Sequence, residues 1–250
     1  MRICRYRLAG QDRYGAVEGA LVRPFTAAPW AGGLPEGKPV QLADVTLLAP
    51  VEPSKVVCVG RNYRAHAKEL GNEVPKTPLL FLKPSTAVVG PQEAIRCPEQ
   101  SREVHHEAEL GIVLGRPLSR ATAAEARLAV FGYACLNDVT ARDIQREEKQ
   151  FTRAKGFDTF CPIGPVVETG IDPMDVSLVC RVNGEERQRG HTRDMVFDPF
   201  ALLAFISGVM TLLPGDVVAT GTPEGVGTIR RGDWVEVEIS GIGVLRNPVT

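Results

Sequence analysis

Acidic side chains gather where the chain enters and leaves apolar strands. Glu107 and Glu109 stand two apart at the start of one such run, and side chains two apart on a strand share a face. Asp138 lies at the end of a second apolar run. Converging carboxylates are unfavourable unless one is protonated or a cation lies between them, and oxygen ligands suit Mg²⁺ or Mn²⁺ better than Zn²⁺. The alternative is a solvent-facing strand face on which the two glutamates pair with Arg102 or Arg142.

Three further residues could move protons or hold an anion. His66 and Glu69 are three apart in a helix-like stretch, 63–70, so they share a face and could hydrogen-bond. A carboxylate that orients an imidazole produces a general base near neutral pH. Lys155 has small and aromatic neighbours and, near a metal, could hold a substrate carboxylate or an enolate oxygen. The alternatives are a solvated His/Glu pair on a surface helix and an ordinary surface lysine.

The elements that must position these residues are mostly strands. Asn183-Gly184 predicts a two-residue hairpin, since both central positions of that turn need positive φ. In the main part of the chain, short apolar and β-branched runs bounded by Gly and Pro predict strands over Lys55–Gly60, Leu79–Lys83, Glu109–Gly115, Val130–Thr140, Val176–Val182, Asp216–Thr220 and Trp234–Ile239. Helical patterns are fewer: Tyr63–Leu70, Ala121–Val130, Ala141–Gln150 and Asp198–Leu213, the last with Asp198 as N-cap and Pro199 in its first turn.

Strands that do not alternate regularly with helices argue against a doubly wound parallel sheet. We therefore predict an α+β, strand-dominated fold with a mostly antiparallel, rolled or sandwiched sheet and peripheral helices. Alternating runs at 2–8 and 16–23 predict an N-terminal β-hairpin, followed by a Pro- and Gly-rich loop at 24–39. These segments divide the chain into a small N-terminal β unit, 1–53, and a main domain, 54–250.

Composition narrows the classes of function. The chain carries 29 Lys and Arg against 30 Asp and Glu, so its net charge is close to zero and does not favour a nucleic-acid or membrane partner. The first residues lack the apolar core of a secretory signal, and the longest apolar stretch is too short to span a bilayer. Six scattered cysteines without a C-x-x-C pair are typical of reduced core thiols. We expect a cytoplasmic protein.

Several motifs, in order over about residues 55 to 248, closely resemble the fumarylacetoacetate hydrolase family. They are Val59-Gly60-Arg61-Asn62-Tyr63 with His66 and Glu69, Phe81-Leu82-Lys83-Pro84-Ser85, His106-Glu107-Ala108-Glu109-Leu110, Asn137-Asp138-Val139-Thr140-Ala141-Arg142-Asp143 with Gln145, Lys155-Gly156-Phe157-Asp158, and Thr220-Gly221-Thr222-Pro223 with Gly225 and Gly227. The resemblance implies a mixed β-roll catalytic domain that usually forms a homodimer, with its active site at one mouth of the roll.

The resemblance also implies roles for individual residues. Glu107, Glu109 and Asp138 match positions that bind Mg²⁺ or Mn²⁺, and Lys155 matches one that contacts the substrate near the metal. The pair His66 and Glu69 matches a water-activating dyad on a mobile lid. Thr222 matches a substrate contact, for which Arg142 and Gln145 are further candidates, whereas Lys83 is left outside the catalytic list.

The function expected from these roles is metal-dependent chemistry on a small 2-oxo acid. The first hypothesis is C–C bond hydrolysis of an acylpyruvate or fumarylpyruvate, in which His66 activates water and cleavage leaves a metal-bound pyruvate enolate. The alternatives are a 2-hydroxyhepta-2,4-diene-1,7-dioate isomerase/decarboxylase of homoprotocatechuate breakdown and an oxaloacetate decarboxylase. A non-catalytic metal- or carboxylate-binding module is the alternative from another class.

Overall fold

The N-terminal segment folds into a small set of antiparallel strands. In the computed structural model, which describes all 250 residues, this segment contains β1 (Arg2–Leu8), β2 (Gln11–Glu18), β3 (Leu21–Phe25), β4 (Val40–Gln41) and β5 (Thr46–Leu48). The predicted hairpin exists, but its second strand at 16–23 is wrong. Ala9 and Gly10 both have positive φ and form the tight turn, so the chain reverses earlier and β2 begins at Gln11.

The main sheet continues from this unit into the rest of the chain. Its strand order is β4-β3-β2-β1-β13-β11-β10-β16-β6-β7, with β5 beside β1 and β8 beside β13. The pairs along this path are antiparallel except β6 with β16, and the side strand β8 also runs parallel to β13, so the sheet is mixed. The added strands are β6 (Val56–Gly60), β7 (Leu79–Lys83), β8 (Val88–Val89), β10 (Ala108–Leu114), β11 (Val130–Asn137), β13 (Cys161–Glu168) and β16 (Val217–Ala219).

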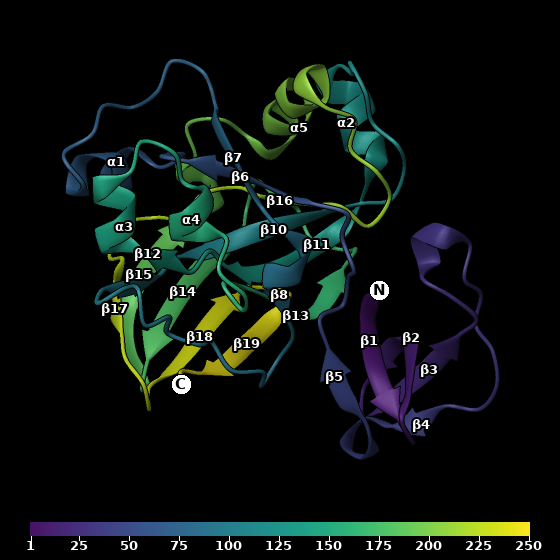
Figure 1. Ribbon diagram of the computed structural model, residues 1–250. Helices are drawn as coiled ribbons and strands as arrows, with labels where there is room; N and C mark the ends of the chain where they lie inside the picture. The colour runs from purple at the N-terminus through teal and green to yellow at the C-terminus, as the bar shows by residue number, and fades with distance from the viewer.

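Two smaller sheets complete the fold. A four-stranded sheet, ordered β15-β14-β18-β19, lies beside the main sheet in Figure 1, and a three-stranded sheet is ordered β12-β9-β17. The predicted Asn183-Gly184 turn joins β14 to β15 with positive φ at both residues, and that prediction is confirmed. The strands are β9 (Val104–His106), β12 (Thr140–Ala141), β14 (Ser177–Val182), β15 (Glu185–His191), β17 (Gly227–Ile229), β18 (Trp234–Ile239) and β19 (Gly243–Pro248).

The core lies on both faces of β10, all seven residues of which are buried. Leu110 and Ile112 point into a large apolar cluster shared with β14 and β18, whereas Val113 belongs to a second cluster shared with β6 and β16. Alternation therefore places Glu109 on the same face as Val113. A strand fixed by apolar packing on both sides is a rigid support for the acids at its start.

Five α-helices lie around the sheets (Figure 1): α1 (Arg64–Glu69), α2 (Ala123–Ala129), α3 (Arg142–Glu147), α4 (Thr152–Lys155) and α5 (Pro199–Val209). The predicted cap of α5 is confirmed, since the carboxylate of Asp198 accepts from two backbone N–H groups of the first turn. The helix stops at Val209 rather than Leu213, because Leu212 instead exchanges backbone hydrogen bonds with Leu118.

The predicted fold class is confirmed: the chain is strand-dominated, with a mixed sheet and peripheral helices. The N-terminal strands are not separate from the main sheet, because β1 pairs with β13. The boundary at residue 53 stays a prediction. All six cysteine thiols are free, and five of them are buried. No helix combines the length and the apolarity needed to cross a bilayer.

Candidate active site

Two strand ends bring the three acids together. The register of β10 with β11 sets Ala108 opposite Asn137, and one step further the Asp138 backbone N–H donates to the Glu107 carbonyl over 2.9 Å. Glu107 lies at the break between β9 and β10, where the chain passes from the three-stranded sheet into the main sheet. One carboxylate oxygen from each of Glu107, Glu109 and Asp138 lies within 4.8 Å of the other two, and all three residues are buried.

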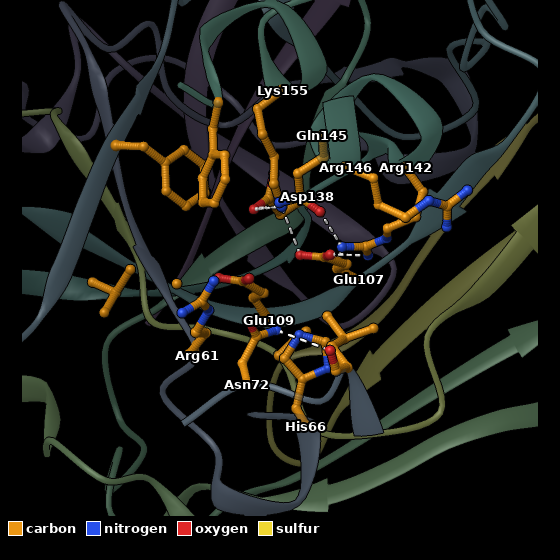
Figure 2. Close-up of a pocket in the computed structure, with 16 residues that line it drawn as sticks. Arg61, His66, Asn72, Glu107, Glu109, Asp138, Arg142, Gln145, Arg146 and Lys155 are labelled. Atoms are coloured by element: carbon orange, nitrogen blue, oxygen red, sulfur yellow. Dashed lines mark hydrogen bonds and ion pairs between the residues drawn. The ribbon is translucent and has the colours of Figure 1, made fainter. Parts of the chain in front are cut away.

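Three cations surround this acid triad (Glu107, Glu109 and Asp138). Lys155 Nζ donates to Glu107 Oε2 over 2.8 Å and to Asp138 Oδ2 over 2.7 Å, as Figure 2 shows. Arg142 donates to the other Glu107 oxygen, and Lys83 Nζ lies 2.8 Å from Asp138 Oδ1. The alternative of a solvent-facing glutamate pair is therefore wrong, although its pairing of Glu107 with Arg142 is correct.

The surroundings shift the pKa values of Glu107 and Glu109 in opposite directions. Burial alone would raise the pKa of Glu107, but Lys155 and Arg142 outweigh it and hold that pKa well below its usual range. Burial, with the charges of Asp138 and Glu107, raises the pKa of Glu109 well above its usual range. Glu109 has one direct hydrogen bond, from the Gly221 backbone N–H over 2.7 Å. Of these two glutamates, Glu109 is therefore the one whose ionised form is destabilised by the neighbouring negative charges.

The donor set of the triad fits a hard divalent cation. All three candidate ligands are carboxylate oxygens, which Mg²⁺ and Mn²⁺ prefer. Asp138 Oδ1 is buried yet accepts no hydrogen bond, because Lys83 directs its N–H groups to the carbonyls of Val139, Lys155 and Phe160. A cation among the three carboxylates would relieve the repulsion at Glu109. The triad could thus hold a metal ion.

Lys83, which was left outside the catalytic list, lies against the acid triad without lining the cavity. Its ammonium group is buried against Asp138 and three backbone carbonyls. A signal was present in the sequence, because Phe81 and Lys83 share a face of one strand and Phe81 lines the same cavity. Strand alternation alone did not show that this face was buried.

The His66 and Glu69 pair joins α1 to the loop after β16. His66 Nδ1 lies 3.2 Å from Glu69 Oε2, and the other Glu69 oxygen accepts from the Gly225 backbone N–H over 2.9 Å. His66 is buried, so the alternative of a solvated surface pair is wrong for the imidazole. Burial lowers its pKa, opposed by the charge of Glu107 and the hydrogen bond to Glu69. A neutral ring with Nδ1–H bonded to Glu69 keeps Nε2 as a free base.

A cavity of about 320 Å³ connects these groups. It is lined by eight of the nine predicted site residues: His66, Glu107, Glu109, Asp138, Arg142, Gln145, Lys155 and Thr222. The ninth, Glu69, does not line the cavity and instead holds His66. In Figure 2, Lys155, Gln145 and Arg142 stand on one side of the acids and His66 on the other. Sequence reasoning therefore identified a set of residues that the fold brings together.

The three predicted substrate-binding residues have different hydrogen-bonding capacity left. Gln145 accepts from Arg142 through its carbonyl oxygen, so its amide NH₂ remains available. The hydroxyl of Thr222 donates to the Ala108 carbonyl over 2.9 Å and accepts from the Gln188 amide over 2.8 Å. Thr222 therefore presents its methyl group and at most one lone pair to the cavity, and Arg142 is largely engaged with Glu107.

Sequence reasoning missed several residues at this site. Arg61, Asn72 and Arg146 line the cavity. Gln188, buried on β15, accepts from the Ala108 N–H of β10 and donates to Thr222, and so ties the four-stranded sheet to the main sheet and to the loop at the cavity. A lone glutamine among charged strand residues carries no sequence signal of this role. Arg61 stood within a quoted motif, but nothing in its neighbours indicated that it faces a cavity.

Comparisons with known proteins agree with this arrangement. Residues 55–250 match the family model described as fumarylacetoacetate (FAA) hydrolase C-terminal, and residues 1–50 match a model described as Rv2993c-like, N-terminal. A structure of 5-carboxymethyl-2-hydroxymuconate delta-isomerase from Mycobacterium smegmatis is 46% identical, with a TM-score of 0.94, over 100% of this chain and 99% of that one.

Two further relatives extend the comparison. A structure of 2-hydroxyhepta-2,4-diene-1,7-dioate isomerase from Mycobacterium marinum is 46% identical, with a TM-score of 0.93, over 100% of this chain and 98% of that one. The human mitochondrial oxaloacetate tautomerase FAHD2A is 45% identical over 220 residues, covering 83% of this chain and 70% of the relative. The family model spans most of the chain, and the chain therefore belongs to the fumarylacetoacetate hydrolase family of enzymes.

Proposed function

We propose that this enzyme hydrolyses a C–C bond of an acylpyruvate or fumarylpyruvate with the help of Mg²⁺ or Mn²⁺. The observation that carries the proposal is a buried imidazole, His66, whose Nδ1 is held by Glu69 and whose ring lines the same cavity as the acid triad. An oriented neutral imidazole beside a site for a hard cation is suited to activating water near a chelating 2-oxo acid.

The residues of the chain supply the proton transfers. His66 takes a proton at Nε2 from a water molecule, while Glu69 holds the Nδ1–H and stabilises the imidazolium that forms. The hydroxide adds to the 4-carbonyl carbon of the substrate, and the bond between C3 and C4 then breaks. The electron pair of that bond becomes the enolate of pyruvate, and the proton held by His66 returns to the products, a carboxylic acid and pyruvate.

Other side chains position the substrate and its developing charge. Lys155 uses two of its three N–H groups on Glu107 and Asp138, so one remains for a substrate oxygen. The free amide NH₂ of Gln145 supplies a second donor on the same side of the cavity. Glu107, Glu109 and Asp138 would hold the metal ion, which supplies Lewis-acid polarisation of the 2-oxo group when it is bound.

A second candidate is proton transfer without C–C hydrolysis. It is favoured by the names of the compared proteins, two of which are isomerases and one an oxaloacetate tautomerase. His66 could equally remove a proton from the carbon next to a 2-oxo group and return it elsewhere. The same cavity would then isomerise a 2-hydroxy-diene-dioate or tautomerise oxaloacetate.

One substrate panel separates these functions. The enzyme, with Mg²⁺ or Mn²⁺ and in parallel with EDTA, is supplied with acetylpyruvate, fumarylpyruvate, oxaloacetate and 2-hydroxyhepta-2,4-diene-1,7-dioate. The proposal expects metal-stimulated release of pyruvate from an acylpyruvate, slowed by about 10²- to 10⁴-fold in His66→Ala. If the parent enzyme hydrolyses none of these compounds but isomerises, tautomerises or decarboxylates one of them, the hydrolase proposal fails.

A further inference from the structure

Each nitrogen of the Arg142 guanidinium has an acceptor of its own. Its two terminal NH₂ groups donate to the carboxylate of Glu107 and to the side-chain oxygen of Gln145, both of which line the cavity (Figure 2). Its Nε–H donates to His105 Nδ1 over 3.4 Å. Arginine cannot accept a hydrogen bond, so this contact needs an imidazole whose Nδ1 carries no proton. His105 does not line the cavity, and it takes no part in the proposed proton transfers.

A second partner fixes the same tautomer of His105. Its Nε2 lies 2.9 Å from a carboxylate oxygen of Glu103, which accepts and does not donate, so Nε2 carries the proton. The imidazole is mostly buried, with 12% of its side chain exposed. A chain of hydrogen bonds thus runs from Glu103 through His105 and Arg142 to Glu107, one of the three candidate metal ligands.

The three-stranded sheet places His105 against Arg142. His105 lies opposite Thr140 where β9 pairs with β12, and Thr140 is two residues before Arg142. The Arg142 backbone N–H then donates to the Glu103 carbonyl over 2.7 Å, so α3 starts directly beside the start of β9. Strand alternation sends the next residue, His106, to the opposite face. Backbone pairing therefore holds His105 at the Nε edge of the guanidinium.

The carboxylate of Glu107 is held between two cations. Arg142 donates to Oε1 and Lys155 Nζ to Oε2, the latter over 2.8 Å, and none of the three side chains is more than 5% exposed. These two bonds set the rotation of the carboxylate, and so the direction in which it meets the other acids of the triad. If the Nε of Arg142 lost its acceptor, the guanidinium could turn, and the group bonded to Glu107 would turn with it.

We propose that His105 is a positioning residue of the metal site: its Nδ1 fixes the guanidinium of Arg142, which in turn orients the Glu107 carboxylate for metal binding. This inference rests on the proposed use of the acid triad for Mg²⁺ or Mn²⁺, and it adds a residue outside the cavity to that site. The feature that matters is a hydrogen-bond acceptor at the position of Nδ1. The bond from Nε2 to Glu103 keeps that nitrogen unprotonated.

Three substitutions separate the acceptor from the rest of the side chain. His105→Asn places an amide oxygen at the position of Nδ1 and keeps an acceptor for Arg142. His105→Gln reaches the position of Nε2, so it keeps a polar contact with Glu103 but leaves the Arg142 Nε–H without its acceptor. His105→Leu removes both contacts. A role in packing or in holding Glu103 would make glutamine the better replacement. The order of the Asn and Gln variants is therefore decisive even where His105→Leu folds poorly.

Calorimetry with Mn²⁺ measures the metal affinity of each variant. His105→Leu and His105→Gln should bind Mn²⁺ about 10- to 100-fold more weakly than the wild type, the range for loss of a group that orients a metal ligand, whereas His105→Asn should stay within about threefold. His191→Leu is the matched control and should keep wild-type affinity. His191 Nδ1 also accepts from the Nε–H of an arginine, Arg193, over 2.9 Å, and its Nε2 lies 3.3 Å from Asp175, but none of these three residues lines the cavity.

The Nε–H of Arg142 gives a readout that needs no metal. In EDTA, its NMR signal, identified by its loss in Arg142→Lys, should be protected from exchange with water in the wild type and in His105→Asn, and should lose that protection in the Gln and Leu variants. Wild-type Mn²⁺ affinity in His105→Leu, or a Gln variant that binds Mn²⁺ as well as the Asn variant, would overturn the inference and leave the metal site in place. If the wild type binds no Mn²⁺, the proposed metal site fails, and the order of protection among the variants alone decides whether His105 positions Arg142.

Discussion

The imidazole of His66 is buried enough to stay neutral near pH 7 and yet keeps one nitrogen free toward the cavity. Its partner Glu69 fixes the tautomer by accepting from Nδ1. Removing such a base costs about 10²- to 10⁴-fold in rate. We therefore expect His66→Ala to lower kcat for acylpyruvate hydrolysis by that range, with little change in binding of oxalate measured by calorimetry. A variant within threefold of wild-type kcat would remove His66 from the mechanism.

The pH profile should report the same residue. Burial lowers the pKa of His66 below its ordinary value of 6.5, so the base stays deprotonated at neutral pH. Activity falls only as pH decreases through that lowered pKa, and the acid limb of kcat/KM is expected below pH 6.5. The hydrogen bond and charge of Glu69 oppose the shift. Glu69→Gln should accordingly move the acid limb to lower pH while reducing the rate; movement to higher pH would contradict this assignment.

At the scale of elements, the cavity depends on how the four-stranded sheet is joined to the main sheet and to the loop after β16. Gln188 on β15 accepts from the Ala108 N–H at the start of β10 and donates to Thr222 and to the Pro223 carbonyl. One buried amide thus connects the strand that carries the acids to the loop that closes the cavity. Its removal leaves a buried backbone N–H without a partner, which costs about 1–3 kcal/mol.

We expect Gln188→Leu to reduce the free energy of unfolding by about 1–3 kcal/mol in urea titrations, and to raise KM because Thr222 and its loop lose their tie. Gln100→Leu is the matched control, since Gln100 is exposed and makes no hydrogen bond within the chain. Its stability should stay within about 0.5 kcal/mol of wild type. Equal effects of the two substitutions would show that the Gln188 network adds nothing to stability.

The elements also show what sequence reasoning could and could not reach. Strands with clear apolar alternation and the Asn183-Gly184 turn were predictable because their signals are local. β13 was not, since Pro162, Gly164 and Pro165 lie within it and all disfavour a strand. It forms because it lies between β1 and β11 in the main sheet, and this pairing overrides local preference.

The site residues likewise divide into those that the sequence could predict and those that it could not. The acids stood out because charges at the ends of apolar strands are unusual, and the family motifs supplied their roles. Lys83, Arg61 and Gln188 are single residues whose meaning depends on which buried group or cavity lies opposite them, and no local pattern encodes that. Long-range packing, rather than the residue type, assigns them to the site.

For the whole molecule, the acid triad couples metal binding to stability. A ligand that binds only the folded state stabilises it by about 2.7 kcal/mol at a hundred times its Kd. For a chain of 250 residues, this corresponds to a rise in Tm of about 5–10 °C. Mg²⁺ or Mn²⁺ should produce this rise in thermal melts, and EDTA should reverse it. An unchanged Tm over a wide range of metal concentration would argue against a site at the triad.

Two substitutions should separate the electrostatics of the folded protein from the effect of the metal. Without metal, Glu109 is a buried acid repelled by Asp138 and Glu107, so Glu109→Gln should leave stability unchanged or raise it. Asp138 is the partner of both Lys83 and Lys155. Asp138→Asn leaves these ammonium groups partly uncompensated and should cost about 3–5 kcal/mol in urea unfolding.

The two variants should respond to Mg²⁺ in the same way, because each lacks one of the three carboxylates and neither should show the metal-dependent rise in Tm. The difference in stability between them should then be the same with and without metal. If Glu109→Gln is as destabilising as Asp138→Asn in EDTA, the repulsion assigned to Glu109 is absent from the folded protein. The electrostatic reason for a cation at this position would be lost with it.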